Sequence, residues 1–138
     1  VVISCLGSWA SLMEAPPVAL PVAPARGQML AFDGPRGLFR SAVMSERAYV
    51  VQRRDGRLVV GSTIEFAGFN KSLTVQGMHA ILCGARRLSR ALDACEFLGA
   101  WTGLRPYSKD QLPIIGPTAI QGLHGGFCDR GLARVFRL

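Results

Sequence analysis

An arginine in the stretch "WTGLRPYSKDQLPIIGPT", residues 101–118, has a setting that suits the capture of a small carboxylate. Arg105 stands between Leu104 and Pro106, and the apolar run 113–116 follows it. A planar guanidinium can hold both oxygens of a carboxylate at once, so one arginine in a stiff, partly apolar frame favours carboxylate binding. We expect Arg105 to lie between the end of an aromatic strand and a glycine-rich turn. The residues alone leave a second interpretation open, a solvated arginine at the edge of a loop.

The cysteines and histidines do not have the spacing of a metal site. No two cysteines form a C-x-x-C pair, and the histidines His79 and His124 complete no zinc-finger pattern with them. We therefore expect no bound metal. Scattered cysteines in so apolar a chain are typical of small buried side chains in a reducing compartment, which favours a cytoplasmic location. The four cysteines are Cys5, Cys83, Cys95 and Cys128.

The composition predicts one folded domain with a net positive charge. Of the 138 residues, 49% are hydrophobic and 18% are charged, which provides enough apolar side chain for a core. The formal net charge is +7, but the arginines are spread along the chain without a patch of interleaved aromatic residues. We therefore expect no nucleic-acid partner. No run of about 18 apolar residues occurs, so we expect no membrane span.

Strand and turn signals occupy most of the chain. The run 25–32, "ARGQMLAF", predicts a strand that an Asp-Gly-Pro sequence ends. Asp55-Gly56 stands between the β-rich runs 49–51 and 58–60. This dipeptide indicates a hairpin, because both of its residues tolerate positive φ. The run 95–101 predicts a further strand.

One long helix is predicted between the two groups of strands. Thr74 can cap it, and apolar residues recur after Thr74 with the spacing of one buried helical face. Three arginines on the opposite face, Arg86, Arg87 and Arg90, are expected to be solvated. The apolar stripe comprises Val75, Met78, Ile81, Leu82, Ala85, Leu88 and Leu92.

The order of strands, one helix and strands predicts the α+β class, with a mostly antiparallel sheet and one long packed helix. Large apolar side chains on the expected inward faces should be buried. These residues are Trp9, Met29, Val50, Val59, Ile81, Leu82, Leu88 and Ile115.

The amino end raises a separate expectation. Residues 1–3, "VVI", are expected to form a buried strand, and "GSW" at 7–9 the turn that leaves it. The sequence contains no Gly-x-Gly-x-x-Gly turn, which is the usual cradle for the pyrophosphate of a dinucleotide. We therefore expect the chain to begin in the middle of a fold.

Four stretches in order resemble the FAD-dependent glycine oxidase and D-amino-acid oxidase family, most closely its thiamine-pathway glycine oxidases. They are "VVISCLGSWA", "LPVAPARGQML", "AYVVQRRDGRLVVGST" and "WTGLRPYSKDQLPIIGPT", and they extend from Val1 to about Leu123. The resemblance implies that residues 1–15 are a remnant of the FAD-binding domain, that 16–123 form the substrate-binding domain, and that 124–138 are a divergent tail. The dinucleotide fingerprint of this family would lie upstream.

The resemblance also implies a chemistry and a site. Family members oxidise small amino acids to imino acids, transfer a hydride to the flavin and form peroxide, while the protein supplies orientation and electrostatics. By this resemblance Arg105, Tyr49 and Arg130 bind the substrate, and Gly7, Trp9 and Gly116 lie near FAD; none of them is assigned a catalytic step. Structural roles are the alternatives. Tyr49 could be a cross-strand packing residue, Gly7 and Gly116 could form turns, and Trp9 could anchor a core.

The end of the chain departs from the family pattern. In "HGGFCDRGLARVFRL" only Phe127 and Arg130 match the family's segment, and the expected closing helix is missing, as in a truncation or a shifted reading frame. Two alternatives therefore stay open beside the oxidase portion: a non-catalytic interaction module without flavin, and a D-amino-acid dehydrogenase that passes electrons to a quinone. We expect this chain alone to be inactive and not to hold FAD tightly. The exact substrate, the electron acceptor and the assembly into a homo-oligomer stay open.

Overall fold

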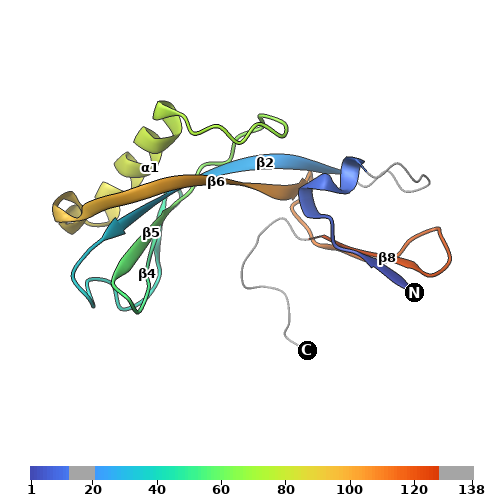
Figure 1. Cartoon of the computed structure of the whole chain (residues 1–138), viewed down its shortest axis with the longest axis horizontal. Helices are drawn as coiled ribbons and strands as arrows, with labels where there is room; N and C mark the ends of the chain where they lie inside the picture. The colour runs from blue at the N-terminus through green and yellow to red at the C-terminus, as the bar shows by residue number, and fades with distance from the viewer. Residues whose placement is uncertain (13–20, 128–138) are drawn as a thin grey trace. The chain divides into compact units, whose positions relative to one another are not determined.

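The computed structural model describes residues 1–12 and 21–127, which form two compact units (Figure 1). Unit 1 takes in residues 1–25, 66–69 and 104 onward, and unit 2 takes in 26–65 and 70–103. The domain boundaries implied by the family resemblance stay a prediction.

Five strands form the larger sheet in the order β3-β4-β5-β2-β6. The pairs β3–β4, β4–β5 and β2–β5 are antiparallel. With one α-helix in the described residues, the predicted α+β fold is confirmed. The strands are β2 (Val22–Asp33), β3 (Val43–Met44), β4 (Tyr49–Gln52), β5 (Arg57–Gly61) and β6 (Glu96–Ser108).

The predicted hairpin joins β4 to β5, but its loop is longer than expected. Arg53 N donates to Arg57 O at 2.8 Å, which leaves the three residues 54–56 in the loop. Gly56 has φ of 99°, whereas Asp55 is not among the residues of positive φ. The glycine alone supplies the left-handed residue of a three-residue loop, and the Asp55 carboxylate accepts a hydrogen bond from Arg57 N at 3.0 Å.

The predicted helix is α1 (Val75–Leu88), and Thr74 caps it by accepting a hydrogen bond from Gly77 N at 3.1 Å. It contacts β4 and β5 and covers one face of the sheet (Figure 1). Its buried residues are Gly77, Ile81, Gly84 and Ala85, so the contact face is rotated from the predicted stripe. Val75 and Leu82 are exposed because the helix approaches the sheet through its small residues. Leu92 lies in a separate 3₁₀ turn, η2 (Arg90–Ala94).

The core of unit 2 lies between α1 and the sheet. Leu30, Val60 and Val50 face each other across β2, β5 and β4, and all three are almost completely buried. The burial predicted for Val50 and Ile81 is confirmed. The other predictions of burial are wrong: Met29, Val59 and Leu88 are half-buried, and Trp9, Leu82 and Ile115 are exposed.

Unit 1 contains a three-stranded sheet of order β1-β8-β7, in which β1 pairs parallel with β8 and β7 pairs antiparallel with it. The elements of this unit are β1 (Val2–Ser4), the 3₁₀ helix η1 (Gly7–Leu12), β7 (Ile114–Pro117) and β8 (Leu123–Phe127). Residues 1–3 were expected to form a buried strand. Val2 and Ile3 do enter β1, but the predicted burial is wrong, because both are more than half exposed. Successive strand residues point to opposite faces, so the described residues cover neither side chain.

Two further expectations concern the surface. Cys5 and Cys83 are exposed and Cys95 is half-buried, so the predicted burial of the cysteines is wrong for these three; Cys128 lies outside the described residues. Among residues 1–12 and 21–127, no group of His, Cys, Asp or Glu is arranged to hold a metal ion. No helix in the same part of the chain is long and apolar enough to cross a membrane.

Candidate functional site

Arg105 lies inside a strand and not at a turn, contrary to the expectation from its glycine and proline neighbours. The strand β6 continues through Gly103 and Pro106 as far as Ser108. It stands at the edge of its sheet, where a proline is tolerated because its missing N–H need not pair. Arg105 is half-buried. A strand holds its side chain in a more defined direction than a loop edge would.

An aromatic pair lies on the same face of β6 as Arg105. Tyr107 is two residues further along the strand, so its side chain points to the same side. Its ring packs edge-on against Phe66, with centroids 4.9 Å apart and planes at 79°. Sequence reasoning missed both residues. The alternation within "RPY" signals Tyr107, but nothing local signals a contact with Phe66.

Tyr49 begins β4 and packs across two neighbouring strands. It pairs with Gly61 of β5, which in turn pairs with Met29 of β2. The Tyr49 hydroxyl lies 3.3 Å from Met29 Sδ. A Cβ at Gly61 would stand 2.8 Å from Met29 Cε and 3.0 Å from the Tyr49 hydroxyl, so these side chains occupy the space above the glycine. This is the cross-strand packing given as an alternative, and the substrate role of Tyr49 stays a prediction.

The 3₁₀ helix η1 after β1 contains two of the residues predicted to lie near FAD, Gly7 and Trp9. Gly7 has φ of 56°, which other residues adopt at a cost. Ser8 is 1% exposed, and its hydroxyl has no hydrogen-bond partner among the described residues. Trp9 is 43% exposed, with its ring centroid 6.0 Å from that of Phe69. A buried hydroxyl left over beside a left-handed glycine is compatible with a polar ligand at this turn.

A row of small residues crosses the three-stranded sheet. Gly125 of β8 pairs with Ser4 of β1 on one side and with Gly116 of β7 on the other. A Cβ at Gly116 would meet no atom within 4 Å, so its own unit leaves the space above it open. Packing within the described chain therefore does not require a glycine there. The role near FAD predicted for Gly116 stays a prediction.

A buried polar network joins β2 to the start of α1. Arg26, 6% exposed, forms an ion pair with Glu65. Gln28 is completely buried and donates to Glu65 Oε1 at 2.7 Å and to Thr74 Oγ1 at 2.8 Å, while its Oε1 accepts from Thr74 N at 2.9 Å. Burial acts to raise the pKa of Glu65, but hydrogen bonds from Thr63, Arg26 and Gln28 outweigh it and lower the pKa. The network fixes the amino end of α1 against the sheet.

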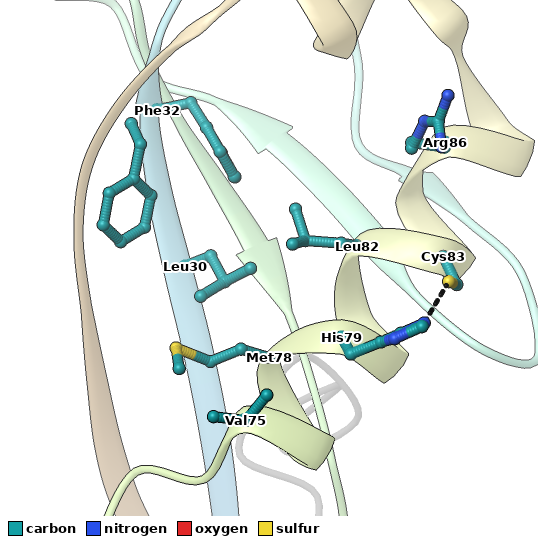
Figure 2. Close-up of a pocket in the computed structure, with 9 residues that line it drawn as sticks. Leu30, Phe32, Val75, Met78, His79, Leu82, Cys83 and Arg86 are labelled. Carbon is teal, nitrogen blue, oxygen red and sulfur yellow. Dashed lines mark hydrogen bonds between the residues drawn. The ribbon is translucent and has the colours of Figure 1, made fainter.

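An open apolar cavity of about 600 Å³ lies along α1, and none of the predicted site residues is among those that line it (Figure 2). Leu30, Phe32, Leu82 and Phe97 are among the residues that line it. His79 and Cys83 lie one helical turn apart beside it, with Nε2 and Sγ 3.2 Å apart. Arg130 lies outside the described residues, so its predicted substrate contact stays a prediction.

Comparison with known proteins agrees with this architecture. Residues 1–134 match the family described as FAD dependent oxidoreductase (DAO). Glycine oxidase of Pseudomonas putida is 35% identical over 117 residues, covering 84% of this chain and 32% of that protein. Hydrogen cyanide synthase subunit HcnC of Pseudomonas protegens is 32% identical over 125 residues, covering 89% of this chain and 30% of that protein.

A solved structure shows the same fold. Glycine oxidase from Geobacillus kaustophilus superposes with a TM-score of 0.85 at 26% identity, covering 93% of this chain and 35% of that one. The fold is therefore that of FAD-dependent oxidoreductases. The chain belongs to the FAD-dependent oxidoreductase (DAO) family, and it spans about a third of the length of the curated relatives it matches.

Proposed function

We propose that this chain is the substrate-binding portion of an FAD-dependent oxidase that acts on small amino acids, glycine or D-amino acids. The similarity to glycine oxidases along most of the chain supports this proposal. The observation that carries it is the position of Arg105, half-buried within an edge strand and followed on the same face by an aromatic side chain.

Arg105 binds the carboxylate of the substrate in this proposal. Its two parallel N–H groups fix both oxygens, and this two-point grip orients the α-carbon for reaction. Tyr49 and Arg130 complete the substrate contacts.

Gly7, Trp9 and Gly116 are the residues that would hold FAD. The left-handed turn at Gly7 and the open space above Gly116 let backbone approach a planar ring. When bound, FAD supplies the acceptor for the hydride and passes the electrons to dioxygen with formation of peroxide. The pyrophosphate of a dinucleotide is usually bound at a glycine-rich turn before a helix, and the sequence of residues 1–138 contains no Gly-x-Gly-x-x-Gly turn, so these residues are proposed to contact FAD only near its flavin ring.

Spectroscopy of the full-length protein tests the proposal. A purified protein with flavin absorbance, bleached anaerobically by glycine or D-alanine and recoloured by air with release of peroxide, is the expected result. A flavin that the amino acids bleach but only a quinone recolours would indicate the dehydrogenase alternative. A colourless protein would indicate the non-catalytic alternative, and a yellow protein that no amino acid bleaches would contradict the proposed substrate class.

A further inference from the structure

The loop that joins β5 to α1 contains two phenylalanines, Phe66 and Phe69, that belong to unit 1. Residues 66–69 belong to unit 1, although the chain on both sides of them belongs to unit 2. Phe66 packs edge-on against Tyr107, and Phe69 lies against Trp9. The first contact holds this short loop beside the end of β6, and the second holds it against η1.

Phe66 keeps most of its surface open despite its contact with Tyr107. It is 66% exposed, whereas the ring it touches is half-buried. An edge-on pair leaves one face of a ring free for another apolar group. A large, exposed phenyl group held in place by a partner has the properties of a contact surface for a ligand.

The aromatic pair and Arg105 share one side of β6. Residues two apart on a strand point the same way and are separated by about 7 Å along it. Tyr107 therefore stands on the side of β6 to which Arg105 points, and Phe66 is held there by its contact with Tyr107. This spacing of about 7 Å is comparable with the distance from the carboxylate to the side chain within one amino acid.

We propose that Phe66 and Tyr107 form the wall that contacts the substituent on the substrate's α-carbon, so that, of the two proposed substrate types, the site favours D-amino acids with an apolar or aromatic side chain over glycine. This inference rests on the proposed function, because it takes Arg105 as the carboxylate-binding residue. It assigns the choice of substrate to the loop 66–69 and the end of β6.

The test uses ligands that cannot be oxidised, so that binding is measured apart from turnover. Acetate and phenylacetate are titrated into the oxidised full-length protein by isothermal calorimetry, and the ratio of their dissociation constants gives the preference for an apolar substituent. Phe66→Ala and Tyr107→Ala should each reduce the preference for phenylacetate by roughly three- to tenfold. Tyr107→Phe, which keeps the ring, should retain it.

Phe97→Ala is the matched control, because Phe97 also lies in an edge-on pair, with Phe32, and is 56% exposed. It should leave the ratio unchanged. If Phe66→Ala and Tyr107→Ala both bind the two ligands with the wild-type ratio, the inference is wrong. Arg105→Lys tests the proposed function separately: it should weaken both ligands, and unchanged binding of both would remove the carboxylate role of Arg105. Failure of the wild type to bind either carboxylate would overturn both ideas.

Discussion

Gly77 has no room for a side chain, and the reason is the buried amide of Gln28. A Cβ at position 77 would stand 2.8 Å from Gln28 Oε1 and closer still to the amide nitrogen. The Gly77→Ala substitution must therefore move Gln28 away from its partners. An alanine would otherwise be the more favourable residue in a helix, so two opposing effects can be compared at one position.

The free energies of these two effects differ enough to predict the sign. Replacing glycine by alanine stabilises a helix interior by up to about 1 kcal/mol. Displacing Gln28 breaks three hydrogen bonds to Thr74 and Glu65, each contributing about 0.5–1.5 kcal/mol net. At about 1 kcal/mol for each bond, the loss is about 3 kcal/mol and the net destabilisation about 2 kcal/mol.

A double-mutant cycle isolates the clash. In a Gln28→Ala background the obstacle is gone, so Gly77→Ala should stabilise the protein by up to about 1 kcal/mol. Urea unfolding followed by circular dichroism measures the free energy of unfolding of the wild type, the two single variants and the double variant. An equal cost of Gly77→Ala in both backgrounds would refute the reasoning, since Gln28 would then not be what excludes the side chain.

Two further predictions concern protonation and cofactor binding. The pKa of Glu65 is lowered below its ordinary value of 4.5, so its stabilising effect should be complete above pH 4.5 and lost as the pH falls through the lowered pKa. Urea unfolding across this acid range should show a weaker pH dependence in Glu65→Gln, and an unchanged dependence would mean that Glu65 has no special role. The chain of residues 1–138, titrated with FAD and followed by flavin fluorescence, should show no tight binding, and stoichiometric submicromolar binding would contradict the need for a separate pyrophosphate-binding turn.

The elements with local signals could be predicted from the sequence. Thr74 and the helical spacing after it identify α1, because a cap and an apolar period are properties of neighbouring residues. Asp55-Gly56 locates the hairpin for the same reason, although the length of its loop depends on strand pairing. Arg105 was singled out by its motif. Its place within β6 was not, because glycine weakens a strand and proline, which has no N–H to pair, is tolerated here only since β6 lies at the edge of its sheet.

Features that depend on contacts between distant segments could not be predicted. The buried face of α1 follows Gly77 and Gly84 because small residues allow close approach, and an apolar pattern instead assigned Val75 and Leu82 to the core. The side chains of the Gln28 network come from β2, from the segment after β5 and from the helix cap. No short motif joins these three segments, and the same holds for the contact of Phe66 with Tyr107.

Reduction of the flavin in the Arg105→Lys variant is the most direct test of whether Arg105 binds the substrate carboxylate. The full-length wild type and variant are mixed anaerobically with increasing amino acid in a stopped-flow instrument, with Arg54→Lys, an exposed residue of the hairpin loop, as the matched control. A lysine keeps the charge but cannot reproduce the two-point grip. We expect unchanged flavin content, a higher apparent substrate constant and a limiting reduction rate lower by on the order of a hundredfold, because a misplaced α-carbon no longer meets the flavin. If the flavin of Arg105→Lys is reduced as fast as that of the wild type and with the same apparent substrate constant, Arg105 is a structural residue and does not bind the substrate carboxylate.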